Sequence, residues 1–343
     1  MSPYLSFVVA ARNDNYGGDF LHRMQVFVNA LLGLWSRYCL DAELVIVEWN
    51  PPEHRPRLEE VIAWPKNLKP GTVRIVEVPA EIHHRLPNSD RMPMFEYIAK
   101  NVGIRRASGE YVLATNPDII FSDQIIRYLA EVEPRPDSFY RVDRYDVGGK
   151  ICLSYSLEQQ LQFCARHAFR VHRIDESVPA RRLARILYRL RYKFSRLRRY
   201  GVVRELIDKE ADASDGQLAS SRRPPTPLVH LNASGDFLLM ANWWWHALRG
   251  YPELATHSHI DSYMVITASV AGLHQIALPH RIYHQEHDRS EQARRPLTVL
   301  NEIPALKEML GTLSLRVTNG ENWGLGQIEL PTTDVRSEVP VAC

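Results

Sequence analysis

The feature of the sequence that most constrains its fold is an alternation of short apolar runs and longer amphipathic segments over the first 135 residues. The apolar runs are rich in β-branched residues and end at polar positions, and apolar residues recur at helical spacing between them. We predict strands at 4–14, 42–52, 73–79 and 110–118, and helices at 19–40, 55–63, 94–108 and 122–133. This β-α-β-α order predicts an α/β fold, in which a parallel sheet has helices on both faces.

The composition is that of a globular protein and excludes some classes of function. The 343 residues can form one large or two modest domains, and no apolar run approaches the roughly 20 residues of a membrane span. Lys plus Arg number 42 against 40 Asp plus Glu, so a net charge of +2 gives no argument for a nucleic-acid partner. The four Cys form no CxxC motif and no signal-peptide pattern is present, so we expect reduced thiols and a cytoplasmic protein.

The middle of the chain has a different pattern. Residues 180–200 hold nine Lys or Arg and no acidic residue, with Leu and Ile on one helical stripe. We expect a basic amphipathic helix over 181–199 and a mobile loop over 208–227. Three interpretations of the helix stay open: packing on the domain by its apolar stripe, peripheral contact with anionic lipid, or contact with an anionic or long polysaccharide.

Order resumes in the last third of the sequence. Residues 229–254 read as a loop, a strand and a helix closed by Gly250. Residues 259–273 read as a further helix, and 274–288 as a strand that leads into a His-rich segment.

Polar residues follow three of the predicted strands, as Arg12-Asn13-Asp14, Glu48-Trp49-Asn50 and Asn116-Pro117-Asp118. Each group alone reads as an ordinary polar loop. Together they predict a ligand site, because open parallel sheets bind ligands at the carboxyl ends of their strands. Gly17-Gly18 is too short for a phosphate-binding loop, so any phosphates would need a divalent cation, to which Asp118 could supply a carboxylate.

Two parts of the chain, about 4–130 and 229–290, resemble GT-A-type glycosyltransferases close to the family 2 group. The resemblance lies in the order of five segments: "AARND", "IAKNVGIRRASGEYVLATNPD" ending where the family has its DXD motif, the acceptor-side segment "SGDFLLMANWWWHALRGYPE", "HIDSYMVITASVAG" and "YHQEHD". It implies a GT-A-type, Rossmann-like, mostly parallel sheet flanked by helices, with a basic helical insertion. It also implies transfer of a hexosyl unit from a nucleoside-diphosphate sugar to a hydroxyl of a saccharide or lipid-linked acceptor.

The resemblance assigns roles to individual residues. The expected nucleotide-sugar contacts are Ala10, Ala11, Arg12, Asn13, Glu48, Arg91, Lys100, Asn116 and Asp118. The expected metal ligands are Asp118 and His284, with His287 competing for the second place, and this mixed shell favours Mn²⁺ over Mg²⁺.

Asp261 is the expected general base, and an in-line base would make the reaction inverting. Asp236 and Trp243 are the expected acceptor or sugar contacts. Each assignment has a structural alternative: a helix cap for Asp261, a turn for Asp236, a surface position for Arg91, and burial of Trp243 against the insertion, although three consecutive Trp cannot all face one core.

The sequence departs from the family pattern at two positions. Asn116 cannot supply a carboxylate, so it is expected to bind ribose or sugar hydroxyls, and Ile260 leaves Asp261 as the only acid of the usual pair. A degenerate nucleotide-sugar-binding module is therefore an alternative function. A sugar-phosphate nucleotidyltransferase fits less well, because the Gly-rich loop with Arg and Lys is missing after the first strand.

We divide the chain into a nucleotide-sugar-binding half at 1–135, a variable region at 136–228, an acceptor and catalytic half at 229–290 and an extension at 291–343. The two halves are expected to form one domain. No nucleic-acid partner is expected, and homo-oligomerisation and association with the cytoplasmic face of a membrane are left open.

Overall fold

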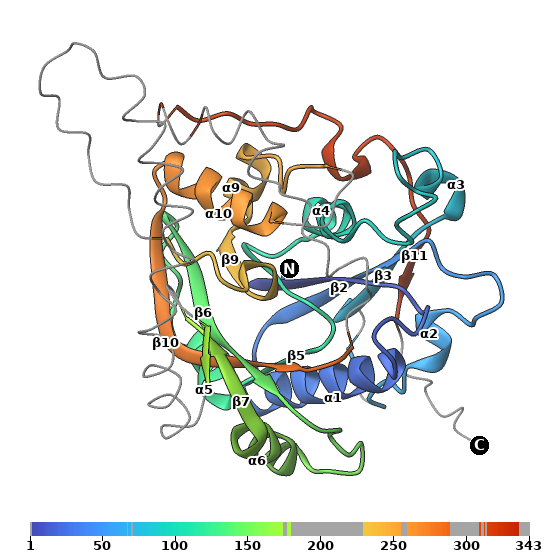
Figure 1. The fold of residues 1–343 in the computed structure, drawn as a ribbon, viewed down its shortest axis with the longest axis vertical. Helices are drawn as coiled ribbons and strands as arrows, with labels where there is room; N and C mark the ends of the chain where they lie inside the picture. Colours follow the sequence, from blue (N-terminus) through green and yellow to red (C-terminus); the bar gives the residue numbers. More distant parts are fainter. Residues whose placement is uncertain are drawn as a thin grey trace, which may run out of the picture.

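A computed structural model describes residues 2–66, 68–69, 71–173, 177–179, 229–254, 259–288, 309, 312 and 314–335 (Figure 1). Within these residues eleven strands form one sheet in the order β11-β3-β2-β1-β4-β9-β6-β10-β5, and β7 and β8 extend it from β6. The strands are β1 Leu5–Ala11, β2 Ala42–Trp49, β3 Val73–Val78, β4 Tyr111–Ala114, β5 Ile119–Phe121, β6 Ser138–Val147, β7 Ala168–His172, β8 Ser177–Pro179, β9 Leu238–Ala241, β10 His274–Gln285 and β11 Thr332–Asp334.

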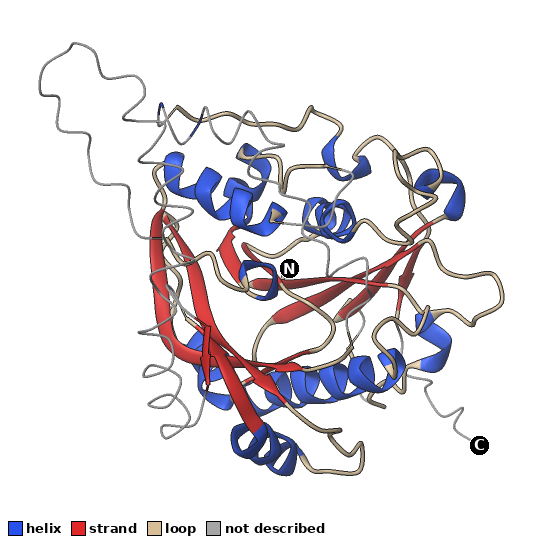
Figure 2. Cartoon of the chain, viewed as in Figure 1, coloured by secondary structure: helices blue, strands red, loops and turns tan. Residues whose placement is uncertain are grey.

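The helices cover both faces of this sheet (Figure 2). They are α1 Phe20–Tyr38, α2 Leu58–Val61, α3 Ala80–His83, α4 Glu96–Arg106, α5 Asp123–Glu131, α6 Leu157–His167, α9 Asn242–Ala247 and α10 Ile260–Val270, with 3-10 turns η1 Ser234–Asp236 and η2 Trp323–Leu325. Helices α1, α5 and α6 lie on one side, and α4, α9 and α10 lie on the other. The predicted α/β fold with a helix-flanked sheet is confirmed.

The strand directions place the carboxyl ends of β3, β2, β1, β4, β6 and β10 at one edge. Strands β3, β2, β1 and β4 are parallel, as the alternating pattern predicts. Strand β9 is antiparallel to both β4 and β6, so β6 runs in the same direction as β4, and β10 is parallel to β6. The later part of the sheet is thus mixed, yet β6 and β10 still end at the edge where β1 and β4 end.

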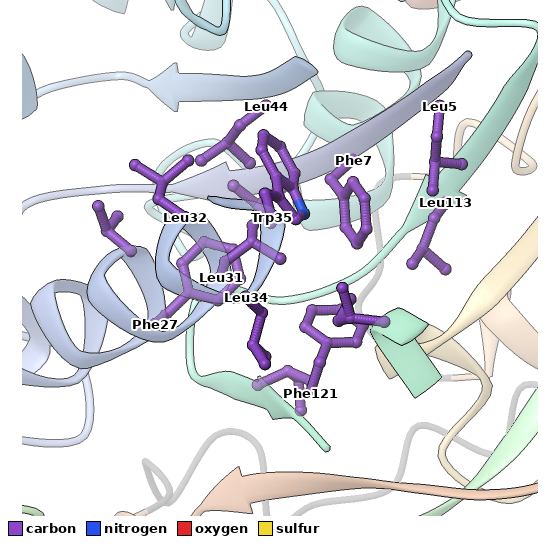
Figure 3. Packing of buried hydrophobic residues seen from close by; sticks show 14 of the residues in the cluster. Leu5, Phe7, Phe27, Leu31, Leu32, Leu34, Trp35, Leu44, Leu113 and Phe121 are labelled. Carbon is purple, nitrogen blue, oxygen red and sulfur yellow. The ribbon is translucent and has the colours of Figure 1, made fainter. Parts of the chain in front are cut away.

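The alternation of side chains along β1 explains why both faces carry helices. Phe7 packs in the cluster with α1 and α5, where it lies against Trp35 and Phe121 with ring centroids 5.0 and 5.4 Å apart (Figure 3). Val8 points to the opposite face and packs in the cluster with α4, α9 and α10. Helix α4 approaches the sheet closely at Gly103, where an added Cβ would lie 2.5 Å from Val8 Cγ1.

The polar interruption at Asn116-Pro117-Asp118 has a topological cause. Strand β4 pairs with β1 and β9, whereas β5, which follows it, pairs antiparallel with β10. The chain therefore leaves one part of the sheet and joins another within four residues. The turn is fixed by a hydrogen bond from Ile119 N to the Asn116 carbonyl at 3.2 Å and by one from Gln285 N to the Asp118 carbonyl at 3.1 Å.

The main difference from the sequence analysis lies in the region 136–228. We described it as a variable region with a basic helix and a mobile loop, and its first part supplies β6, which lies inside the sheet between β9 and β10, together with α6 and β7. The expected basic helix at 181–199 and loop at 208–227 fall outside the described residues. None of the helices described is both long and apolar enough to span a membrane.

Candidate functional site

Asp118, His284 and His287 form a compact cluster at the carboxyl edge of the sheet. Asp118 Oδ2 lies 3.2 Å from His287 Nε2 and 3.6 Å from His284 Nε2. The three ligand atoms lie within 4.8 Å of one another, a spacing that suits a metal ion. His284 and His287 were competing candidates in the sequence, and the structure places both imidazoles at the same carboxylate.

The electrostatics of the cluster favour a charged carboxylate. Burial alone would raise the pKa of Asp118, but the imidazoles of His284 and His287 outweigh it and hold this pKa well below its usual value. Burial alone would lower the pKa of His284, but the surrounding carboxylates raise it well above its usual value, and Asp118 has the largest effect among them. Asp118 Oδ1 is buried and accepts no hydrogen bond from the described residues, so a ligand atom of the carboxylate remains open.

The loop after β1 holds His287 in place. Nδ1 of His287 donates to the carbonyl of the next residue, Asp288, at 2.9 Å, which leaves Nε2 as the nitrogen that faces Asp118. The Tyr16 ring meets the His287 ring edge-on, with centroids 5.4 Å apart. Gly17 has a φ of +68°, and a Cβ at this position would collide with the imidazole. The Gly17-Gly18 pair therefore permits close approach to His287.

Asn116 and Asp236 form a second polar group beside the cluster. The Asn116 amide donates to Asp236 Oδ1 at 2.8 Å, and Arg144 Nη1 donates to Asp236 Oδ2 at 2.7 Å. Burial would raise the pKa of Asp236, but Arg144 outweighs it and lowers the pKa below its usual value. The two residues expected at sugar hydroxyls are thus in contact with each other, and Asp236 is ionised.

Asp261 lies at the first turn of α10 and holds the turn that carries Asp236. Its Oδ2 accepts hydrogen bonds from Ser234 Oγ at 2.7 Å and from Gly235 N at 2.8 Å. Lys100 fixes the same turn from the other side, because its Nζ donates to the Gly235 carbonyl at 2.8 Å. The expected base is therefore adjacent to the expected sugar-binding residue.

The contacts of Lys100 differ from the expected ones. The side chain is fully buried, and Nζ contacts Glu96 Oε1 at 2.7 Å in addition to the Gly235 carbonyl. This geometry favours a role in positioning the Gly235–Asp236 turn over direct contact with a nucleotide.

The ends of β1 and β2 are tied together at the same edge. Ala10 and Ala11 are the last buried residues of β1. Arg12 Nε donates to the Asn50 carbonyl at 2.7 Å, and the Asn13 amide donates to the Pro56 carbonyl at 3.0 Å. Asn13 Oδ1 is buried and accepts no hydrogen bond from the described residues.

Two further residues expected at the nucleotide lie in opposite surroundings. Glu48 is buried at the end of β2, and its carboxylate accepts from Leu58 N at 3.1 Å. Arg91 is exposed in the segment between α3 and α4. The structure thus gives Glu48 a partner inside the protein, whereas it leaves Arg91 at the surface.

Replacing Glu48 by Gln is expected to raise stability at alkaline pH. Burial raises the pKa of Glu48 from 4.5 to about 7, so the folded state binds this proton more tightly than the unfolded state does. The resulting stabilisation is complete below pH 4.5 and is lost as pH rises through 7. The free energy of unfolding of Glu48→Gln relative to the wild type should therefore increase by on the order of 2 kcal/mol between pH 5 and pH 8. Urea denaturation at both pH values measures the change. The exposed Glu59→Gln serves as the control, and a parallel pH profile for Glu48→Gln and wild type would contradict this account.

The structure places Trp243, which we expected to contact the acceptor or a sugar, away from the Asp118 cluster. Ala241, the residue before α9, pairs with Tyr111 at the amino end of β4, and Trp244 Nε1 donates to the Pro136 carbonyl just before β6. Helix α9 therefore begins at the edge of the sheet opposite Asp118. Trp243 is 54% exposed and stacks on Trp244, whereas Trp245 is buried, which confirms that the three Trp do not share one core.

Trp243→Ala is expected to leave site chemistry unchanged. Because α9 lies at the opposite edge, divalent-cation affinity and donor KM should both stay within about twofold of the wild type. Surface substitutions that disturb no buried contact, cap or ion pair usually have effects this small. Titration calorimetry with Mn²⁺ and steady-state kinetics check this. A tenfold weaker Mn²⁺ affinity or a tenfold higher donor KM would show that Trp243 contributes to the site.

Sequence reasoning missed the residues that β6 and β7 bring to this edge. Asp146 is fully buried and contacts His172 Nε2 at 2.8 Å and His284 Nδ1 at 3.3 Å, and Arg144 contacts Asp236. Glu286 lies 3.6 Å from His284 Nδ1. The available signal was apolar-polar alternation over 140–143 and, after a break in phase, over 144–147, a pattern typical of a strand.

Comparisons with known proteins show a weak likeness in chain path. No protein-family model matches this chain, and no curated protein matches it. Among solved structures, Staphylococcus aureus TarS residues 1–349 is similar with a TM-score of 0.42 and 11% identity, over 94% of this chain and 68% of that one. The catalytic domain of Drosophila β1,4-galactosyltransferase 7 in complex with xylobiose gives 0.39 and 10%, over 93% and 83%. The galactosyltransferase LgtC in complex with donor and acceptor sugar analogs gives 0.36 and 11%, over 94% and 100%.

Proposed function

We propose that this protein is a metal-dependent glycosyltransferase that moves a hexosyl unit from a nucleoside-diphosphate sugar to a hydroxyl of a saccharide or lipid-linked acceptor. The observation that carries the proposal is the cluster of Asp118, His284 and His287 at the carboxyl edge of the sheet, with Asp261 and Asp236 nearby. The proposal rests on these side chains.

The cluster fits a divalent cation on chemical grounds. It offers an ionised carboxylate and two imidazole nitrogens, and Asp118 Oδ1 is a buried acceptor with no donor among the described residues. Asp118, His284 and His287 would hold Mn²⁺ or Mg²⁺, and the mixed oxygen and nitrogen set favours Mn²⁺. When bound, such a cation neutralises charge on a diphosphate leaving group as a Lewis acid.

The remaining residues divide the work of binding and proton transfer. Asn116 and Asp236 offer an amide and an ionised carboxylate to sugar hydroxyls at the carboxyl edge of the sheet. Asp261 takes the proton of the attacking acceptor hydroxyl, as a positioned carboxylate can. Both hydrogen bonds that Asp261 accepts within the described residues use Oδ2, so Oδ1 is the atom we assign to the proton. Attack opposite the leaving group with this base gives inversion.

Two details favour the alternative of a nucleotide-sugar-binding module without turnover. Asn116 replaces a carboxylate, and the Asp236 carboxylate is already paired with Arg144. Release of nucleoside diphosphate from a panel of nucleotide sugars, with Mn²⁺ and with and without saccharide acceptors, tests the proposal. We expect acceptor-dependent release that EDTA abolishes. Donor binding with no release across a broad acceptor panel would support the binding module, and pyrophosphate release from a nucleoside triphosphate and a sugar phosphate would indicate a nucleotidyltransferase.

A further inference from the structure

His284 has charged groups at both ring nitrogens. Its Nε2 lies 3.6 Å from Asp118 Oδ2, while Nδ1 lies 3.3 Å from Asp146 Oδ1 and 3.6 Å from Glu286 Oε2. The side chain is only 8% exposed, so these contacts determine its orientation. The proposed cation site uses Nε2 alone, which leaves the groups at Nδ1 without a role in the mechanism.

The strand register places Asp146 beside His284. In the parallel pair of β6 and β10, His284 is the direct Cα partner of Asp146. Partners in register point to the same face of a sheet. Asp146 is fully buried, so the contact is protected from water. The backbone pairing itself therefore fixes this carboxylate against the imidazole.

Two buried polar atoms at this contact complement each other. Asp146 Oδ1 and His284 Nδ1 are both buried, and within the described residues neither makes a hydrogen bond of good geometry. Leaving a buried polar group unpaired is destabilising, so the two atoms favour a hydrogen bond with each other. Because the atoms lie 3.3 Å apart, a small rotation of the imidazole satisfies both, with Nδ1–H donating to Oδ1.

Asp146, His284 and Glu286 also have the spacing of a second metal cluster, but the charge around Asp146 argues against a cation there. Arg144 Nε lies 3.0 Å from Asp146 Oδ1, Arg170 Nε contacts Oδ2, and His172 Nε2 lies 2.8 Å from Oδ2. The guanidinium groups already supply positive charge to this carboxylate. Asp146 is thus an anchored acceptor for a neighbouring donor.

We propose that Asp146 is a positioning residue that accepts a hydrogen bond from His284 Nδ1–H, turns Nε2 toward Asp118 and thereby sets the affinity of the cation site. Histidines that bind metals commonly donate a hydrogen bond from the N–H of their second ring nitrogen to a carboxylate, which fixes the tautomer and ring orientation. The inference rests on the proposed cation site, and it adds a residue of β6, which none of the predicted site residues belongs to.

Cation affinity of the full chain tests the role of Asp146. Titration calorimetry with Mn²⁺ should show about 10- to 100-fold weaker binding for Asp146→Asn than for the wild type, as for lost carboxylate partners of metal-bound histidines. Glu286→Gln is the matched control, because it also removes one negative charge within 4 Å of Nδ1. We expect less than a threefold change for Glu286→Gln. Equal effects of the two variants would show a plain charge effect and overturn the proposal.

The Nδ1 proton of His284 in the wild-type protein provides a second readout that needs no folded Asp146 variant. With diamagnetic Zn²⁺ bound, ¹H–¹⁵N NMR should show that this proton is hydrogen-bonded, shifted downfield and protected from exchange with water, with the resonance assigned from a His284→Gln sample. An Nδ1 proton that exchanges rapidly with water, or wild-type Mn²⁺ affinity in Asp146→Asn, would overturn the proposal while the cation site stands. If the wild type binds neither Mn²⁺ nor Zn²⁺, the cation site and the proposed function fail first.

Discussion

Asp118→Asn is expected to abolish both cation binding and glycosyl transfer. The carboxylate is the only anionic ligand of the proposed site, and Oδ1 is a buried acceptor with no donor among the described residues. An amide of the same shape cannot carry the charge that a divalent cation requires. We expect kcat/KM with Mn²⁺ to fall about a thousandfold, which corresponds to about 4 kcal/mol of transition-state stabilisation. Mn²⁺ titration and nucleoside-diphosphate release measure the two losses.

Asp41→Asn is the matched control for this variant. Asp41 is an exposed carboxylate just before β2, at the edge of the sheet opposite Asp118. It should retain wild-type cation affinity and turnover. If Asp118→Asn binds Mn²⁺ as the wild type does, the cation lies elsewhere and the assignment of Asp118, His284 and His287 is wrong.

Asp261→Asn is expected to lose turnover while it keeps donor binding. Asn retains an oxygen that can accept from Ser234 Oγ and Gly235 N, so the turn that carries Asp236 stays in place. It cannot accept a proton, and positioned acid–base groups typically contribute 10²- to 10⁴-fold. We therefore expect kcat to fall by about this factor, with the donor Kd unchanged within about threefold. Single-turnover kinetics and donor titration separate the two quantities.

Ser234→Ala distinguishes catalysis from structural support at the same carboxylate. It removes one hydrogen bond to Asp261 Oδ2 and leaves the acid intact. Loss of this bond should lower the free energy of unfolding by about 1 kcal/mol and leave kcat within a few-fold of the wild type. Near-normal turnover in Asp261→Asn, together with a lowered melting temperature, would reduce Asp261 to a residue that fixes the turn.

The elements that could be predicted from the sequence are those whose signals are local. Strands β1 to β4 are short apolar runs, and Ser122 caps α5 through a hydrogen bond from Ile125 N at 3.4 Å, as its position before a helical pattern indicates. Asp118 also gave a local signal, because it directly follows a buried strand. In these cases the neighbouring residues along the chain largely determine the local structure that was predicted.

Strand β6 could not be recognised in the same way because its charged residues find their partners far along the chain. Arg141 is fully buried and donates to the carbonyls of His230, Ser234 and Asn232. In the sequence this residue looks like a surface cation, and nothing nearby along the chain indicates that it is buried. The pairing of Asp146 with His284 depends equally on the register of two strands more than 100 residues apart.

For Trp243, exposure could be predicted from the sequence but its place in the fold could not. Exposure of one Trp followed from the impossibility of burying three in a row, and the structure confirms it. The edge of the sheet on which α9 begins depends on β9 running antiparallel to β4, a direction that no local pattern encodes. The chemistry of a side chain could be inferred from the sequence, whereas its neighbours required the topology.

The most direct test of the central claim is anomalous diffraction from crystals grown with Mn²⁺ and a nucleoside diphosphate. The account predicts one manganese peak in contact with Asp118 and with Nε2 of both His284 and His287, and with the diphosphate completing its shell. A peak held by other residues, or a bound nucleoside diphosphate with no manganese at Asp118, would contradict it.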